Sequence, residues 1–228
     1  MGAIKLPHSS GNSMSIAAPA SNPSGHLEIK VPATIGSAKQ VLRNSSTAGT
    51  LEFGTPYGEL IHNASSNSTV SNITHDSLDT DLYKAWHVIG HFIPTTDNVA
   101  LNFYFRDGGS DCVADQYSIG QMWSYPNDDH LSNAANDQGR MQIAGDAGNA
   151  AREGWKINLF IFPDRSGDAT GQTNVCFWQA TWRYGDHAYR AAAAAGDYDT
   201  DVFPDGFKLQ PHSGQIGEYS YALYGLFR

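Results

Sequence analysis

A pattern of short strands and turns recurs along most of the chain and constrains its fold more than any other feature. In residues 99–106 (VALNFYFR), large apolar residues occupy every second position, so one face of a strand is apolar and the other is mixed. Residues 107–110 (DGGS) follow at once and predict a hairpin turn. Further strands are predicted at residues 82–93, 113–125, 140–144, 155–162, 174–184, 202–210 and 219–227. Eight such strands are typical of a jelly roll or a related β-sandwich.

The composition favours the same all-β class. Asp outnumbers Glu by 18 to 5, and Gly accounts for 23 of the 228 residues. Asp favours turns and strand ends, whereas Glu favours helix interiors. The one helix-prone segment, residues 190–195 (RAAAAA), is too short to form a stable helix in water, so we expect a loop or a single turn there.

Residues 1–54 differ from the rest of the chain in charge and in apolar content. They carry a net charge of +2, whereas the remaining 174 residues carry −11, from ten Lys or Arg against 21 Asp or Glu. They contain no Trp or Tyr and one Phe, and their short strand-like pieces place apolar side chains at Leu27, Ile29, Val31, Val41, Leu51 and Phe53. So few large side chains bury too little apolar area to offset the entropy of ordering about fifty residues.

These contrasts predict three parts. Residues 1–54 are expected to form an extended oligomerisation or anchoring arm with short strands, ordered only against copies of itself or against another protein; a flexible tail is the alternative. Residues 55–80 are expected to be a Ser/Thr/Asn-rich connector, and residues 81–228 a jelly-roll-like β-sandwich.

Several classes of partner are excluded by charge and hydropathy. Nucleic-acid binding depends on clustered cations, but the body of the chain is acidic and has no Lys/Arg stripe. No apolar run approaches the roughly 18 residues of a membrane span, and the first residues lack the apolar region of a signal peptide. We therefore expect no nucleic acid, no membrane insertion and no secretion by a signal peptide.

Two patterns resemble metal sites but lack necessary elements. Residues 197–201 (DYDTD) place carboxylates as in an EF-hand loop, but Val202 stands where Gly is required and Lys208 where Glu is required. An EF-hand is excluded, while an irregular calcium site on this cluster stays open. His87 and His91 lie in a β-like segment, where residues four apart are separated by roughly 13 Å and cannot share a metal.

Signatures of catalysis are also missing. The chain has no Gly-x-Ser-x-Gly elbow, no glycine-rich phosphate loop and no Cys–His motif. Glu153 and Glu218 could serve as the paired carboxylates of a glycosidase, but so could the acids of any acidic sandwich. Cys112 and Cys176 form no CxxC motif; two free core thiols are expected, with a single disulfide as the alternative. We expect no enzymatic activity, no cofactor and no metal.

Aromatic residues supply one candidate binding surface. Trp123 and Tyr125 lie two apart, as do Trp182 and Tyr184, so each pair can point to one face of its strand. Asp186 follows the second pair closely. Aromatic rings beside carboxylates are typical of sugar recognition, which makes these five residues a candidate glycan or receptor surface. The alternative is that the rings fill the core of the sandwich.

Both ends of the chain resemble surface proteins of tailed-phage virions, especially fibre-type proteins of phages with marine and cyanobacterial hosts. The similar segments are residues 14–20, 27–32, 38–42 and 47–54, which resemble short N-terminal repeats, and residues 83–90, 106–110, 213–216 and 223–226 in the body. The resemblance implies a structural or host-contact role, commonly as a trimer, with no enzymatic residues.

This resemblance leads to an expected function and location. We expect a homotrimer on the virion, assembled in the host cytoplasm, that contacts other capsid or tail proteins and a host surface glycan. Two placements are open, a short tail fibre and a capsid decoration that stabilises the head. A carbohydrate-binding or carbohydrate-active sandwich is the alternative from another class.

Overall fold

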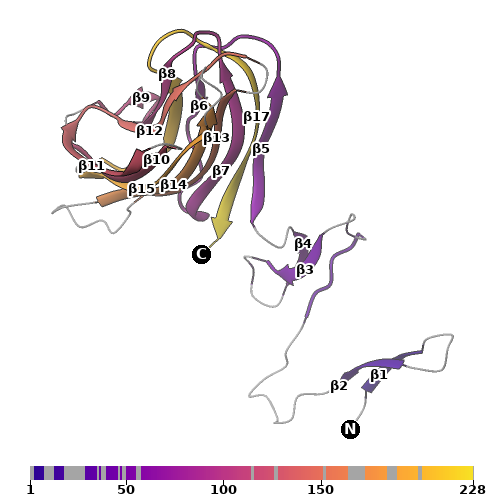
Figure 1. The fold of residues 1–228 in the computed structure, drawn as a ribbon. Coiled ribbons are helices and arrows are strands. Elements are labelled where there is room, and N and C mark those ends of the chain that lie inside the picture. Colours follow the sequence, from indigo (N-terminus) through magenta and orange to yellow (C-terminus); the bar gives the residue numbers. More distant parts are fainter. Residues whose placement is uncertain are drawn as a thin grey trace. The chain divides into compact units, whose positions relative to one another are not determined.

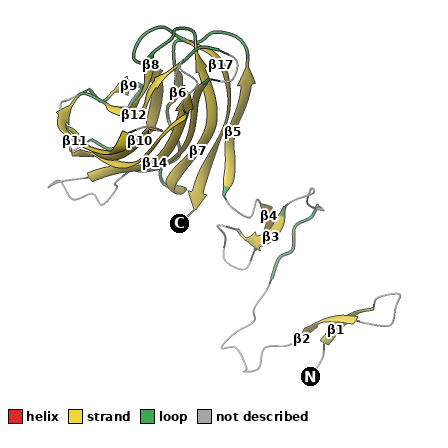
Figure 2. Ribbon diagram, in the orientation of Figure 1, coloured by secondary structure: helices red, strands yellow, loops and turns green. Residues whose placement is uncertain are grey.

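In the computed structural model the chain forms two units, Met1–Pro56 and Tyr57–Arg228. The structure describes residues 3–7, 13–17, 29–34, 36, 40–45, 47, 50–54, 58–113, 116–125, 128–150, 153–163, 173–183, 189–199 and 202–227. Within these residues the secondary structure consists of strands in antiparallel sheets, with no helix (Figure 1, Figure 2). The predicted all-β class is therefore confirmed.

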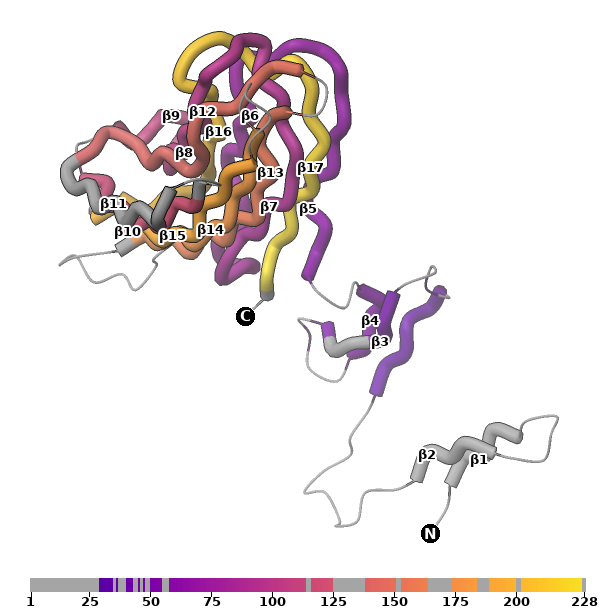
Figure 3. Tube along the Cα trace, viewed as in Figure 1, coloured from indigo at the N-terminus to yellow at the C-terminus, as the bar shows by residue number. Residues whose placement is uncertain are grey.

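The second unit is a β-sandwich of one large and one smaller sheet (Figure 3). In order across the large sheet, the strands are β11 (Asp128–Gln138), β10 (Tyr117–Tyr125), β15 (Tyr189–Asp199), β14 (Thr173–Arg183), β13 (Gly154–Phe162), β7 (Tyr83–Pro94), β17 (Ile216–Phe227) and β5 (Glu59–Ser66). The smaller sheet contains β12 (Met141–Ala147), β8 (Val99–Asp107), β16 (Gly206–Pro211) and β6 (Ile73–His75), with β9 (Ser110–Asp111) paired to β8.

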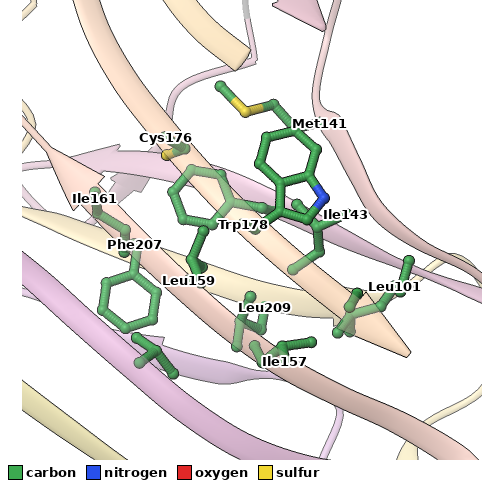
Figure 4. Packing of buried hydrophobic residues seen from close by; sticks show 14 of the residues in the cluster. Leu101, Met141, Ile143, Ile157, Leu159, Ile161, Cys176, Trp178, Phe207 and Leu209 are labelled. Carbon is green, nitrogen blue, oxygen red and sulfur yellow. The ribbon is translucent and has the colours of Figure 1, made fainter. Parts of the chain in front are cut away.

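One hydrophobic core joins the two sheets (Figure 4). Leu159 and Trp178 enter it from the large sheet, and Leu101, Phe207 and Leu209 enter it from the smaller one; all five side chains are buried. Burying a side chain of this size contributes about 1.5–3 kcal/mol relative to leaving it exposed. All residues of this core lie between positions 61 and 223, so the second unit contains its own core.

The turn between β8 and β9 forms the predicted hairpin. Arg106 pairs with Asp111 and Asp107 with Ser110, which leaves Gly108 and Gly109 as a two-residue loop. Both glycines have positive φ, 53° and 80°. A two-residue hairpin loop of this kind requires positive φ at both positions, which Gly adopts without the steric cost of a side chain.

The alanine-rich segment is a strand, so the expected loop or single turn is wrong. β15 pairs along its length with β14 on one side and with β10 on the other. These two ladders satisfy the backbone groups of the segment, and tertiary pairing therefore overrides the weak β propensity of Ala. Asp197 and Asp199 of the acidic cluster belong to this strand rather than to a loop.

Two strands of the sandwich come from residues 55–80, the Ser/Thr/Asn-rich segment. β5 pairs with β17 at the edge of the large sheet, and β6 pairs with β16 in the smaller sheet. The large sheet also contains β11, which the sequence did not predict, because its residues are mostly small and polar.

The first unit contains two hairpins, β1 (Ala3–Pro7) with β2 (Ser13–Ala17) and β3 (Val41–Asn44) with β4 (Leu51–Gly54). Lys30 forms an isolated bridge with Thr50 beside the second hairpin. Short strands in this region were predicted. No helix in the described residues is long and apolar enough to cross a membrane.

Candidate functional site

The arm residues predicted to mediate assembly differ in exposure. Ile29 and Val31 are 70% and 72% exposed, and Val41 is also exposed. Leu51 and Phe53 are half-buried, while Leu27 lies outside the described residues. In this unit, large apolar side chains therefore face solvent in a single copy of the chain.

The structure places the predicted aromatic surface only in part. Trp182 is 2% exposed and belongs to the core, and the half-buried Trp123 packs edge-on against it with ring centroids 5.4 Å apart. These two rings therefore share a face, but that face points into the sandwich. The side chain of Tyr125, and both Tyr184 and Asp186, lie outside the described residues.

A close backbone approach makes room for the two indoles. An ideal Cβ on Gly145 would lie 2.7 Å from the Trp182 ring and 3.0 Å from the Trp123 ring. The carbonyl of the same glycine accepts a hydrogen bond from Trp155 Nε1 at 2.9 Å. Gly145 thus allows three indoles to pack in one region of the core.

The side of the large sheet that faces away from the core carries two adjacent rows of side chains. Because successive residues of a strand point to opposite faces, the residues between these two rows point into the core; they include Trp178, Leu159 and Val88. We call these two outward rows the outer face. The first row consists of Met122, Ala193, Gln179, Asn158, Ile89, Ala222 and Asn63, and the second of Gly120, Ala195, Phe177, Phe160, His87, Tyr224 and Leu60.

The outer face exposes large apolar side chains. Met122 is 59% exposed, Phe177 50% and Ile89 48%, and Leu60 is also exposed. Phe162, in the neighbouring row, packs edge-on against Phe177 with ring centroids 5.8 Å apart. Single exposed apolar residues are common, but a contiguous group on one sheet face is typical of a binding surface.

A shallow depression of about 350 Å³ lies at one end of the outer face. It exists because Gly120 and Ala195, on adjacent strands, have little or no side chain. Phe177 forms one wall, and Ser118 and Asp197 lie on its polar side. The Oδ1 atom of Asp197 is buried and has no hydrogen-bond partner within the described part of the chain.

The outer face carries no formal charge at neutral pH. Its only titratable side chains are His87 and Tyr224. His87 stacks on Phe160 with ring centroids 4.0 Å apart, and its Nε2 lies 2.5 Å from Oδ1 of Asn158. Burial lowers the pKa of His87, with the hydrogen bond to Asn158 acting in the opposite direction, so the imidazole is neutral.

A second histidine lies in the sandwich beside β16. His75 Nε2 is 3.0 Å from the Tyr221 hydroxyl, and its ring packs against Phe207 with centroids 5.2 Å apart. Burial and, to a smaller extent, nearby His62 lower the pKa of His75 to about 4, while Asp76 opposes the shift. The neutral imidazole therefore serves packing and hydrogen bonding.

An ion cluster lies on the smaller sheet. Asp111 accepts hydrogen bonds from Arg106 and from Lys208, and Arg106 Nε donates to Asp76 at 2.6 Å. The Lys208 ammonium also lies 4.3 Å from the centroid of the Tyr104 ring. Each cation faces a carboxylate, so the cluster is compensated and indicates a structural role.

Neither metal nor thiol chemistry has a centre in the described residues. No group of three His, Cys, Asp or Glu side chains there could hold a metal ion. Cys112 and Cys176 are both buried free thiols, and burial raises the pKa of Cys112 to about 11.

A comparison with protein-family models, curated proteins and solved structures finds no match. The outer face is therefore interpreted from its own residues.

Proposed function

We propose that the chain is a structural component of a phage virion surface, a short tail-fibre-like protein that assembles as a homotrimer through residues 1–54. The observation that carries this proposal is the exposure of Ile29 and Val31 on either side of Lys30. Fully burying such a side chain contributes about 1.5–3 kcal/mol, and three copies of the arm can gain this energy together. The assignment to a virion rests on the sequence resemblance.

The body supports a structural rather than a catalytic role. The cations of the ion cluster are paired with carboxylates, His75 is neutral, and the outer face exposes large apolar side chains without a charged residue in its two rows. A surface of this kind suits contact with a macromolecule. In the proposed protein, the β-sandwich faces outward and contacts a host surface glycan.

A capsid decoration protein is the second candidate. It is favoured by the charge difference between the arm, at +2, and the acidic body, at −11. The arm could dock on an acidic capsid surface through Lys30 and its apolar neighbours, while the acidic body projects into solvent.

Particles produced from the genome that encodes the chain test both candidates. They are purified, analysed by mass spectrometry for the chain, and labelled with gold-conjugated antibody raised against it. A tail fibre places the gold at the tail, and a decoration protein places it over the head. Absence of the chain from purified particles overturns the proposal.

A separate variant tests the role of the arm. Ile29→Asp combined with Val31→Asp introduces two charges at exposed positions of the full chain. We expect this variant to dissociate at higher protein concentration than the wild type. The matched control is Ser71→Asp, at an exposed loop position of the second unit. If both variants dissociate at the same protein concentration, the arm is not part of the assembly contact.

A further inference from the structure

The depression on the large sheet combines an aromatic wall with a polar edge. Gly120 and Ala195 form its floor, and the exposed ring of Phe177 lies at the end of the same cross-strand row. The next outward row contains Ser118 and Asp197, which pair with each other across β10 and β15. A ligand on the floor can therefore contact an apolar ring and two polar side chains at once.

The Asp197 carboxylate has acceptor capacity that the fold does not use. Its Oδ1 atom is buried and accepts no hydrogen bond within the described part of the chain, although Asp197 as a whole is half-buried and lines the depression. An enclosed carboxylate is poorly hydrated, so a donor that reaches its open side forms a strong bond. Charge-assisted hydrogen bonds are about twice as strong as those between neutral groups. The site therefore favours a ligand that carries donors.

The polar groups around Phe177 favour hydroxyl donors over a cation. The Ser118 hydroxyl both donates and accepts, and so does the amide of Gln179, which is exposed two residues beyond Phe177 on the same face of β14. A cation offers donors only, so it can use the carboxylate but not the donors of Ser118 and Gln179. Sugar hydroxyls pair with both kinds of group, and the C–H face of a sugar ring supplies the apolar area that packs on an aromatic ring.

Two other ligand classes lack what they need at this position. An anionic ligand finds no Lys or Arg among the described residues of the lining and is repelled by Asp197. A calcium ion needs about six to eight oxygen ligands. The described lining offers one carboxylate and one hydroxyl, and the carbonyls of its strands are paired in the ladders of β10, β14 and β15. A neutral ligand with several hydroxyls is therefore favoured.

We propose that the depression binds a segment of a neutral oligosaccharide. One sugar ring packs on Phe177, a hydroxyl donates to Asp197, and further hydroxyls form hydrogen bonds with Ser118 and Gln179. The volume of about 350 Å³ lies at the lower end of the range of about 300–1,000 Å³ for small-molecule sites, which suits a short segment of a sugar chain. This inference rests on the proposed contact with a host surface glycan and assigns that contact to the outer face and its neighbouring row.

Titration calorimetry and saturation-transfer NMR with the full chain test the site. The neutral probes are maltohexaose, cellohexaose, chitohexaose and mannohexaose, and the acidic probe is hexagalacturonate. We expect at least one neutral probe to bind and its C–H protons to receive saturation from aromatic protons of the protein. Hexagalacturonate should not bind, because the site carries a carboxylate and no described cation.

Two substitutions remove the groups that contact the sugar. Phe177→Ala removes the ring, and Asp197→Asn removes the charge with little change of shape. Each should weaken binding of the neutral probe by about tenfold. The matched controls are Phe203→Ala and Asp146→Asn, at exposed positions outside the described lining of the depression, and they should leave binding unchanged.

A third substitution fills the floor of the depression. An ideal Cβ on Gly120 meets no described atom within 4 Å, so Gly120→Val occupies the depression without a clash, and Val is favoured in strands. We expect this variant to lose binding by tenfold or more, about the effect of removing the ring, while its Tm is not lowered. The control is Ser124→Val, which is exposed on the same face of β10 four residues away, and it should bind the probe as the wild type does.

The outcomes separate this inference from the proposed function. If a neutral probe binds equally well to Phe177→Ala and to Gly120→Val, the glycan contact lies elsewhere, so the inference is overturned and the proposed function stands. The inference is also overturned if no neutral probe binds, if hexagalacturonate binds as tightly as the neutral probes, or if poly-lysine binds in their place. The proposed function is judged separately, by the presence of the chain in purified particles.

Discussion

The ion cluster on the smaller sheet gives a sharp prediction for stability. Asp111→Ala removes the carboxylate that accepts from both Arg106 and Lys208. Arg106 keeps Asp76, but Lys208, whose side chain is 9% exposed, keeps only its contact with the Tyr104 ring. Hydrogen bonds to charged groups contribute about 1.5–3 kcal/mol each, and removing one partner of a buried pair costs about 3–5 kcal/mol. Because Asp111 is partly exposed, we expect a loss of about 2–4 kcal/mol.

Thermal unfolding followed by circular dichroism measures this loss. For a domain of this size, one kcal/mol shifts Tm by about 2–4 °C, so Asp111→Ala should lower Tm by about 5–15 °C. The double variant Asp111→Ala with Lys208→Met removes both charges and should recover most of the loss, because an apolar replacement of a buried pair is often neutral. A shift below about 2 °C, or a double variant as unstable as Asp111→Ala alone, would refute the assigned dependence of Lys208 on Asp111.

Three further predictions concern the core. Gly145→Ala should destabilise the protein by about 1–3 kcal/mol in urea unfolding, because the new Cβ overlaps the Trp182 ring; an unchanged midpoint would contradict the assigned packing. The pKa of His75 is about 4 in the folded state and 6.5 ordinarily, so between these pH values the folded state binds fewer protons than the unfolded state. The free energy of unfolding should therefore fall as pH drops from about 6.5 to about 4. His75→Gln should weaken this pH dependence, and an unaltered pH profile in that variant would exclude His75 as its source. Cys112 and Cys176 should react with a maleimide only on unfolding, and fast labelling of the native protein would show that they are accessible.

The sequence predicts the sandwich well where apolar and polar residues alternate. Residues 99–106 form β8, and Gly108 and Gly109 form the hairpin loop after it. The sequence-based prediction fails for β15, because a run of alanines has no alternation of apolar and polar residues that would distinguish a strand from a helix or a loop. Only the pairing with β10 and β14 decides between them. Ladders with distant strands are tertiary information that local patterns do not contain.

The candidate site shows the same limit. Even spacing predicted that Trp123 and Tyr125 share one face of their strand and that Trp182 and Tyr184 share one face of theirs, but spacing alone does not say which face of a strand is buried. The outer face did leave a signal. Residues 158–162 (NLFIF) and 175–178 (VCFW) are apolar on both faces of their strands, as in sheets that are covered on both sides. This pattern does not say what covers the second face of the strands. The outer face could be recognised as an exposed surface only from the register of the large sheet.

The native mass of the full chain, measured by light scattering across a range of concentrations, tests most directly whether this protein is an assembly subunit. One copy has a mass of 24.7 kDa. The exposed apolar residues of the arm predict association that increases with concentration, and the proposed homotrimer has a mass of about 74 kDa, three times the mass of one copy. A mass of one copy at the highest concentration, in a folded protein, would contradict the account.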